Sequence, residues 1–365
     1  MSLKCGIVGL PNVGKSTLFN ALTASIAAEA ANYPFCTIEP NTGIVSVPDE
    51  RLIKLAQNAG SAKIIPAFIE FVDIAGLVKG ASKGEGLGNK FLSHIREVDA
   101  IIHVLRCFED QDITHVHGKI DPIHDAEIVE TELIIADLES IDKRIASNEK
   151  KLKSGDKKIA ETIELLKACK AVLEQGNPVR TLIDKYSKKD LSSLQLITSK
   201  PVLYICNVLE SEAASGNDFS GQIEQKAKNE KANSVIISSK IEAEISTLNT
   251  ETEKQEFLES LGLKETGLSK IIQSAYSLLG LKSFFTIGPK EAHAWTFESG
   301  TLASQAAGII HTDFERGFIR AEVINYADLL SIGSEAKAKE LGKLRIEGKE
   351  YVMQDGDVVH FRFNV

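Results

Sequence analysis

The stretch Gly9-Leu10-Pro11-Asn12-Val13-Gly14-Lys15-Ser16 decides the fold. It matches the pattern G-x-x-x-x-G-K-[ST], follows the apolar stretch Lys4 to Val8 and precedes Thr17 to Leu22, where apolar residues recur with helical spacing. A strand, a glycine-rich loop and a helix in this order can bind phosphates, because backbone N–H groups at the positive end of the helix point at the anion. We expect Lys15 to reach the β and γ phosphates and Ser16 to offer its hydroxyl to Mg²⁺.

The same motif predicts a set of nucleotide contacts. We expect them from the consecutive residues Asn12, Val13, Gly14, Lys15, Ser16 and Thr17, with Lys15 also acting in catalysis. The alternative is a tight glycine turn that binds no ligand, which the flanking strand and helix disfavour.

A triphosphate switch also needs groups that sense the γ-phosphate and its metal. Asp73-Ile74-Ala75-Gly76 follows an apolar stretch, which predicts Asp73 as the outer-sphere magnesium carboxylate and the Gly76 N–H as a γ-phosphate donor. Thr37, in the loop after the first helix, is the best candidate to close over the metal. Its alternative role is that of a threonine at the entry to a strand.

The strand candidates that follow are almost continuously apolar, as is typical of parallel strands covered by helices on both faces. They are Ala67 to Val72, Ala100 to Leu105, Pro201 to Cys206 and Ser234 to Ile237. The pattern predicts an α/β core.

A long interruption without strand signals runs from about Glu127 to Ile197. Apolar residues recur there at spacings of three and four on both sides of a break at Ser154-Gly155-Asp156, which predicts two antiparallel helices. Lysines crowd the break: Lys150, Lys151, Lys153, Lys157 and Lys158. They are either a solvated helix tip or a contact to a phosphate backbone.

The last part of the chain, after Leu281, changes to short strands and glycine turns. The strand candidates are Ala292 to Phe297, Phe318 to Ile324, Glu350 to Met353 and Val358 to Phe363. Asp355-Gly356, between the last two, predicts a hairpin turn. We expect a small mixed β domain.

Composition limits the classes of function. The chain has 365 residues, 43% of them hydrophobic and 25% charged, which is typical of a globular protein of two or three domains. The net charge of −9 argues against indiscriminate binding of DNA or RNA through bulk charge. No apolar run reaches the length of a membrane span, and the five cysteines are scattered without a C-x-x-C pair. We expect a cytoplasmic monomer with reduced thiols and no membrane or DNA partner.

Three stretches closely resemble the YchF (Obg-like ATPase) family: Cys5 to Thr17, Phe35 to Asn41 and Asp73 to Gly88. The resemblance spans the chain. It implies a P-loop NTPase core of the G-domain type with a helical coiled-coil insertion and a C-terminal TGS domain, a ubiquitin-like β-grasp module. The expected boundaries are 1–126 with 198–281 for the nucleotide-binding domain, 127–197 for the insertion and 282–365 for the TGS domain.

Base recognition is expected to depart from that of ordinary GTPases. These read guanine with Asn-Lys-x-Asp, whereas this chain has Asn207-Val208-Leu209-Glu210, without the lysine stem and with a longer acid. Guanine specificity should suffer. The resemblance also implies ATP, bound through Asn207 and the Val208 main chain, and it likens Ser238-Ser239-Lys240 to the fifth G-motif, with Ser238 completing the base pocket. ATP is therefore predicted over GTP, although Glu210 keeps GTP open.

The expected catalytic group differs from that of many GTPases. Leu77 stands where many GTPases keep a glutamine that orients the attacking water, so another group must act or turnover is slow. His115 best matches the family's proposed catalytic position, and its alternative is a plain surface histidine. His103 lies in an apolar strand and is expected to be a satisfied core residue. Asn12 matches an asparagine with which some related GTPases hold K⁺, or it only stabilises the loop.

We therefore predict a Mg²⁺-dependent switch that binds and hydrolyses ATP, and the resemblance makes the ribosome its partner. Two alternatives remain. One is a GTPase of the same fold, and the other is a nucleotide-sensing scaffold that binds the ribosome or RNA and hydrolyses nucleotide only incidentally.

Overall fold

The computed structural model describes residues 3–29, 41–74, 87–110, 119–152, 156–248 and 250–364. The chain divides into two compact units. Unit 1 comprises Met1–Val45 and Glu70–Leu278, and unit 2 comprises Ser46–Ile69 and Leu279–Val365. Within the described ranges no helix is long and apolar enough to cross a membrane.

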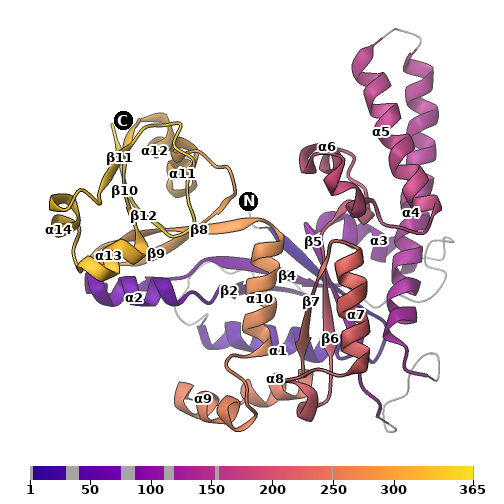
Figure 1. Ribbon diagram of the computed structural model, residues 1–365, viewed down its shortest axis with the longest axis horizontal. Coiled ribbons are helices and arrows are strands. Elements are labelled where there is room, and N and C mark those ends of the chain that lie inside the picture. The colour runs from indigo at the N-terminus through magenta and orange to yellow at the C-terminus, as the bar shows by residue number, and fades with distance from the viewer. Residues whose placement is uncertain are drawn as a thin grey trace. The chain divides into compact units, whose positions relative to one another are not determined.

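Unit 1 is built on a six-stranded sheet with the order β2-β4-β1-β5-β6-β7 (Figure 1). Its strands are β1 (Lys4–Val8), β2 (Thr42–Ser46), β4 (Phe68–Asp73), β5 (Ala100–Arg106), β6 (Val202–Asn207) and β7 (Asn233–Ile237). The pairs β1–β4, β1–β5, β5–β6 and β6–β7 are parallel. Residues of β1, β5 and β6 are almost entirely buried, which confirms the predicted apolar parallel strands.

Helices cover this sheet, and α10 and α7 lie on either side of β6 and β7 (Figure 1). The helices are α1 (Lys15–Glu29), α3 (Leu87–Glu97), α4 (Pro122–Leu152), α5 (Lys157–Glu174), α6 (Lys188–Ser193), α7 (Asp218–Asn229), α8 (Ser239–Ile245), α9 (Glu251–Ser260) and α10 (Gly267–Leu278). Short 3₁₀ turns are η3 (Val179–Asp184), η4 (Ile197–Ser199) and η5 (Glu210–Glu212). The mixed α/β fold predicted for the core is confirmed.

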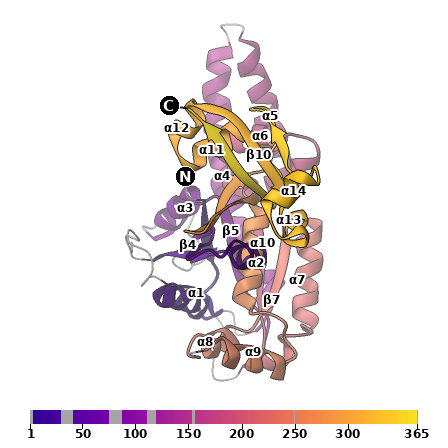
Figure 2. The ribbon, with the colours of Figure 1, turned by 90° about the vertical axis from the view of Figure 1, so that its left-hand side faces the viewer.

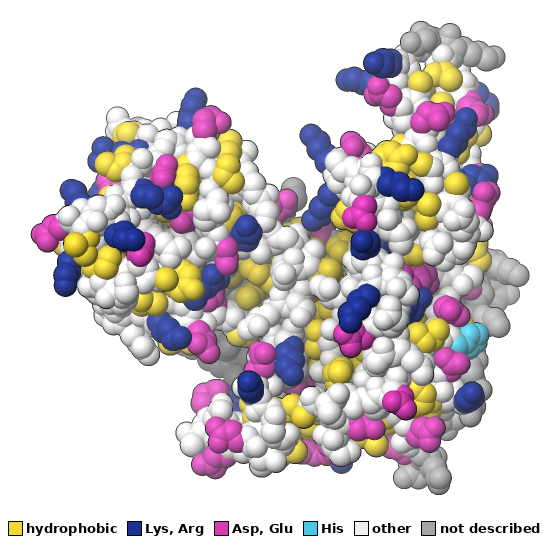
Figure 3. Space-filling model, in the orientation of Figure 1, with side chains coloured by type: hydrophobic (Ala, Val, Ile, Leu, Met, Phe, Trp, Pro, Cys, Tyr) yellow, Lys and Arg dark blue, Asp and Glu magenta, His cyan; other side chains and the backbone are white. Residues whose placement is uncertain are grey.

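The predicted helical interruption is present as α4 and α5, which lie side by side and extend beyond the sheet (Figures 1 and 2). The first helix begins at Pro122, earlier than the predicted Glu127. The second begins after Asp156, whose side chain accepts a hydrogen bond from the Lys158 N–H at 2.9 Å. A core including Ile141, Leu166 and Cys169 joins the pair. In Figure 3 this part of the surface carries lysines and acids together.

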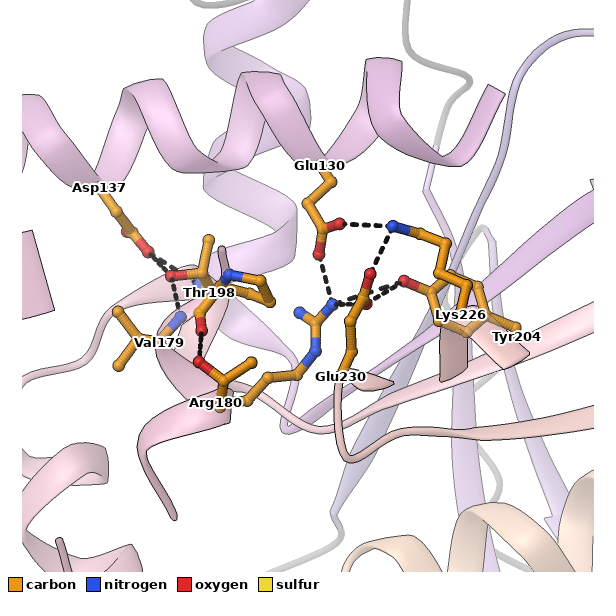
Figure 4. Close-up of polar contacts among 10 residues, drawn as sticks. Glu130, Asp137, Val179, Arg180, Thr198, Tyr204, Lys226 and Glu230 are labelled. Atoms are coloured by element: carbon orange, nitrogen blue, oxygen red, sulfur yellow. Dashed lines mark hydrogen bonds and ion pairs between the residues drawn. The ribbon is translucent and has the colours of Figure 1, made fainter. Parts of the chain in front are cut away.

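A buried network of charges fixes the base of this insertion to the sheet (Figure 4). Arg180 donates to Glu130 and, at 2.5 Å, to Glu230. Lys226 pairs with the same two carboxylates, and the Tyr204 hydroxyl donates to Glu230 at 2.7 Å. Two cations and two carboxylates therefore balance one another, as buried charges require. The cluster joins α4, η3, β6 and α7.

The end of the insertion is held from two sides. Asp137 of α4 accepts hydrogen bonds from the N–H groups of Ile197 and Thr198 at 3.0 and 2.8 Å and from the Thr198 hydroxyl at 2.7 Å. Burial still raises the pKa of Asp137 above its usual range. Lys200 donates to the carbonyls of Ile95, at 2.9 Å, and Arg96, at 2.8 Å, and so caps the end of α3. The insertion is thereby connected to the helix that follows residues 75–86.

His103 is buried in β5 as predicted, with its ring 5.6 Å from that of Tyr204. Its Nε2 has no hydrogen-bond partner among the residues described, so the expectation of a fully satisfied side chain is wrong. Burial, followed by the charges of Lys226 and Arg180, lowers the pKa of His103 to about 3. The imidazole is therefore neutral at physiological pH.

Unit 2 contains a second six-stranded sheet with the order β11-β10-β12-β8-β9-β3. Its strands are β3 (Ile64–Ile65), β8 (Leu281–Ile287), β9 (Ala292–Glu298), β10 (Phe318–Asn325), β11 (Arg345–Glu347) and β12 (Asp357–Phe363). Its helices are α2 (Glu50–Ala59), α11 (Ala303–Ile310), α12 (Thr312–Arg316), α13 (Tyr326–Ile332) and α14 (Glu335–Glu340). The residues between β2 and β4 thus supply a helix and a strand to this unit.

This contribution changes the expected domain boundary. We assigned residues 46–69 to the nucleotide-binding domain, but they cluster with the C-terminal unit. The reason is main-chain pairing: β3 runs parallel to β9, the Ala62 N–H donates to Pro289 O at 3.0 Å and the Ala292 N–H donates to Lys63 O at 2.9 Å. Sequence-distant pairing of this kind leaves no local signal.

Arg51 of α2 joins this segment to the rest of unit 2. Its guanidinium donates to Asp49 at 2.8 Å and to Asp355 at 2.7 Å, and lies 5.3 and 5.4 Å from the ring centroids of Phe285 and Tyr326. Both carboxylates raise the pKa of Arg51 despite its partial burial. The arginine therefore combines paired charges with stacking on aromatic rings.

The predicted hairpin at Asp355-Gly356 is wrong. Residues 350–353 form no strand beyond an isolated bridge between Val352 and Leu302, and β12 pairs instead with β10 and β8. The Asp355 carboxylate accepts the Ser283 N–H at 3.0 Å, and Gly356 adopts φ +84. The turn therefore leads the chain into the middle of the sheet. The helices α11 to α14 were also missed in a region expected to be mostly strand.

Candidate functional site

The glycine-rich loop connects the end of β1 to the start of α1, as the motif predicts. The helix begins at Lys15, and the Leu18 N–H donates to Gly14 O at 2.9 Å. Asn12 and Gly14 adopt positive φ angles of 62 and 94. Glycine takes such angles without steric cost, and asparagine tolerates them better than most residues. The loop is therefore wrapped at the N-terminus of a 15-residue helix, where anions bind.

Two glycines of the loop are required by close approach. A Cβ at Gly9 would lie 2.7 Å from the Val104 carbonyl oxygen, and one at Gly14 would lie 2.4 Å from Asn207 Nδ2. Both distances are shorter than real Cβ contacts. The loop thus packs directly against β5 and against the segment predicted to bind the base.

Asp73 lies beside the phosphate loop because β4 pairs with β1, where Asp73 is in register with Ile7. Its carboxylate forms an ion pair with Lys15. Ser16 and Thr17, in the first turn of α1, have exposed side chains. The motif lysine and the predicted magnesium carboxylate therefore meet although they are 58 positions apart.

The oxygen chemistry here fits a magnesium ion bound together with phosphates. Mg²⁺ is a hard cation that takes one or two protein oxygens and completes its shell with phosphate and water. The Ser16 hydroxyl and the Asp73 carboxylate are such donors. Across the described ranges no cluster of three or more His, Cys, Asp or Glu side chains that could hold a metal ion occurs.

Asn207, at the end of β6, links the phosphate loop to the start of α8. Its Nδ2 donates to the Val13 carbonyl at 2.9 Å, and its Oδ1 accepts the Ser239 N–H at 2.9 Å. The side chain is only 4% exposed. The following Val208 donates its N–H to Ile237 O at 2.8 Å. One amide therefore fixes the positions of the phosphate loop, the end of β6 and the start of α8.

Glu210 and Lys240 form an ion pair beyond this clamp. Both carboxylate oxygens of Glu210 lie 3.0 Å from Lys240 Nζ. The hydrogen bond to Glu210 raises the pKa of Lys240 above its usual range. Ser238, predicted to complete the base pocket, is buried and stands at the N-cap of α8 without a side-chain capping bond.

Several predicted site residues lie outside the described ranges. They are Thr37, Gly76 and His115, together with Leu77 at the glutamine position. Just before residues 111–118, Arg106 donates to the carbonyls of Phe108 at 3.2 Å and Asp110 at 3.0 Å.

Sequence reasoning missed two residues of this arrangement. Ser239 provides the N–H that meets Asn207, and its buried Oγ has no hydrogen-bond partner in the part of the chain that the structure describes. Lys240 holds Glu210. Both belong to Ser238-Ser239-Lys240, the segment likened to the fifth G-motif, and the role of Ser238 in the base pocket stays a prediction.

Comparison with known proteins gives two family matches. Residues 4–163 match a family described as a 50S ribosome-binding GTPase, and residues 281–364 match the YchF-GTPase_C family, described as a protein of unknown function. The protein named ribosome-binding ATPase YchF of Bacillus subtilis is 56% identical to this chain, over all of both chains. The chain belongs to the YchF family.

Other YchF proteins are also similar to this chain over nearly its whole length. The ribosome-binding ATPase YchF of Escherichia coli O157:H7 is 50% identical over the whole of both chains. The solved structure of the Schizosaccharomyces pombe YchF GTPase superposes with a TM-score of 0.88 at 39% identity, covering 99% of this chain and 98% of that one. The resemblance to the YchF family is thereby confirmed, and so is the P-loop GTPase type of the nucleotide-binding fold. The family to which the chain belongs is thus one of nucleotide-binding hydrolases.

Proposed function

We propose that this protein is a Mg²⁺-dependent molecular switch that binds and hydrolyses ATP and associates with the ribosome. The observation that carries the proposal is the convergence of three segments. The phosphate loop after β1, Asp73 at the end of β4 and Asn207 at the end of β6 meet at the carboxyl edge of one parallel sheet. Ligands of open α/β sheets bind at that edge.

Each segment has a role in the proposal. Backbone N–H groups of residues 12–17 bind the phosphates, and Lys15 neutralises charge that develops on the β and γ phosphates. Ser16, Thr37 and Asp73 hold Mg²⁺, which when bound offsets phosphate charge. The Gly76 N–H binds the γ-phosphate, and His115 orients the attacking water. Asn12 provides a place for K⁺ beside the phosphates.

The base pocket is proposed from Asn207, the Val208 main chain, Glu210 and Ser238. The names of relatives differ on the nucleotide, since the Bacillus protein is named an ATPase and the Schizosaccharomyces protein a GTPase. The motif lysine that stacks on guanine is replaced by Val208, which is 2% exposed. This favours ATP, with weaker GTP. Glu210 is the one feature that favours GTP.

The proposal also assigns a role to each domain. Residues 1–126 and 198–281 bind nucleotide except for 46–69, 127–197 form the helical arm, and 282–365 form a TGS module completed by 46–69. Ribosome binding comes from the names of the relatives and the family description. Because acids accompany the lysines on the arm (Figure 3), the contact is proposed to be local rather than a uniformly basic face. A cytoplasmic monomer is proposed.

Hydrolysis is tested by phosphate release from ATP with Mg²⁺. Replacing Lys15 with Met should lower turnover at least 100-fold, because charge stabilisation at the transferred phosphoryl group is lost, at about 2.7 kcal/mol or more. Lys54→Met is the matched control, since Lys54 pairs with Glu50 on an exposed helix surface of unit 2. Turnover by Lys15→Met equal to that of the control would contradict the proposed role.

Ribosome association is tested by co-sedimentation at several salt concentrations. Charge reversal of Lys150, Lys151 and Lys153 should weaken binding and reduce its salt dependence if the arm contacts phosphates. Reversal of Lys54, Lys228 and Lys264, which are exposed elsewhere, is the matched control. Unchanged co-sedimentation of the first variant would remove the arm tip from the proposal.

A further inference from the structure

Glu210, which forms an ion pair with Lys240, occupies the motif position of the acid that reads guanine in ordinary GTPases. Glu210 is the fourth residue of the altered base motif, three positions after the clamping Asn207. Lys240 follows Ser239, whose N–H is held by the same clamp. The two ends of the ion pair are therefore attached to segments that one buried amide keeps in place.

The ammonium group of Lys240 lies close to both oxygens of the acid. Nζ of Lys240 lies 3.0 Å from Oε1 and 3.0 Å from Oε2 of Glu210. The Lys240 side chain is 69% exposed and that of Glu210 is 38% exposed. The pair is at the surface, so its contribution is modest and weakens with salt.

The two purines make different demands on such a carboxylate. Guanine presents two donors on one edge, N1–H and the 2-amino group, and an acid reads it by accepting both. Adenine presents a lone pair at N1 and a C–H at position 2, so a bare carboxylate there would face a lone pair. A carboxylate already held by an ammonium group therefore reads guanine less well, because the two donors of guanine must share its lone pairs with the cation or displace it, whereas adenine makes no such demand.

We propose that Lys240 is a specificity-determining residue that withholds Glu210 from guanine and so favours adenine nucleotides. The proposal rests on the proposed nucleotide function of this site and names a residue to which that function gave no role. It explains how an acid can remain at the guanine-reading position of a site that prefers ATP. Selectivity then comes from hindering the wrong base as well as binding the right one.

The experiment is competition of ATP and GTP, with Mg²⁺, against a fluorescent nucleotide analogue bound to the full-length protein. The variants are Lys240→Met, Glu210→Gln and the double variant. Lys228→Met is the matched control, because Lys228 pairs with Glu224 at 2.7 Å on an exposed helix of the same unit. The measured quantity is the ratio of the GTP and ATP dissociation constants.

Lys240→Met should shift this ratio toward GTP by about two- to fivefold, the range of an exposed ion pair. In the Glu210→Gln background the same change should leave the ratio unaltered, since no charge remains to be released. The control should match the wild type, and the shift should shrink at high salt.

The outcomes separate the two proposals. A wild-type protein that prefers ATP, together with a ratio unchanged by Lys240→Met, overturns the role of Lys240 and leaves the ATP assignment intact. An equal shift in the Glu210→Gln background also overturns it, because Lys240 would then act without Glu210. A wild-type protein that prefers GTP overturns the ATP assignment and the role of Lys240 together.

Discussion

Replacing Asn207 with Asp tests the clamp that joins the phosphate loop to the base segment. The substitution keeps the shape of the side chain and the acceptor for the Ser239 N–H, but replaces the Nδ2 donor with an oxygen. The 2.9 Å hydrogen bond to the Val13 carbonyl is then lost, and two oxygens face each other in a site that is 4% exposed. Nucleotide affinity should fall because the loop loses its support.

The magnitude follows from the geometry. Leaving a buried carbonyl unpaired costs about 1–3 kcal/mol, and the repulsion between the two oxygens adds to this. If most of the cost appears when the loop binds phosphate, Kd should rise at least about tenfold, equivalent to about 1.4 kcal/mol.

The assay is nucleotide binding together with thermal unfolding, with Asn217→Asp as the control. Asn217 also uses Nδ2 to hold a carbonyl, that of Cys107 at 2.7 Å, and also accepts a backbone N–H, that of Ser220 at 3.0 Å. The control should lose stability but retain affinity. The reasoning is refuted if Asn207→Asp binds nucleotide within twofold of the wild type, or if both variants lose affinity equally.

Two further predictions concern stability. The pKa of His103 lies near 3, below the value of about 6.5 for an unfolded histidine, so the unfolded state binds more protons between these values and stability should fall as the pH is lowered. The loss attributable to this residue is about 2 kcal/mol at pH 5, and urea unfolding at pH 7 and 5 should show a smaller loss for His103→Phe; an equal loss would contradict the shift. Replacing Arg51 with Met should destabilise unit 2 by about 1–2 kcal/mol, because two carboxylates lose their partner at a partly exposed site. Trp295 on β9 is the single tryptophan of the chain and reports unfolding of this unit, so an unchanged midpoint of its fluorescence transition would contradict the role of Arg51.

Much of the unit 1 fold could be predicted because its signals are local. The strand Lys4–Val8 has the predicted bounds, since a continuously apolar strand next to a glycine-rich loop is unambiguous. Unit 2 was predicted less well. Its α2 and β3 come from residues 46–69, and the strand predicted at 350–353 is a bridge to Leu302, so pairing across long sequence distances overrode local pattern.

In the candidate site, too, local features could be predicted from the sequence, whereas some contacts between distant segments could not. The phosphate loop could be placed from its own residues, because glycines, lysine and hydroxyl have fixed spacing. The contact between Lys15 and Asp73 also follows from strand order, since both stand at the carboxyl ends of neighbouring strands. The pair of Glu210 with Lys240 could not be predicted, because it depends on how η5 and the start of α8 face each other.

The most direct test of the central claim is calorimetric titration of the purified protein with non-hydrolysable ATP and GTP analogues in the presence of Mg²⁺. The account predicts that the ATP analogue binds at least about tenfold more tightly, a difference of about 1.4 kcal/mol. Equal or tighter binding of the GTP analogue would contradict it, and Glu210 would then read guanine.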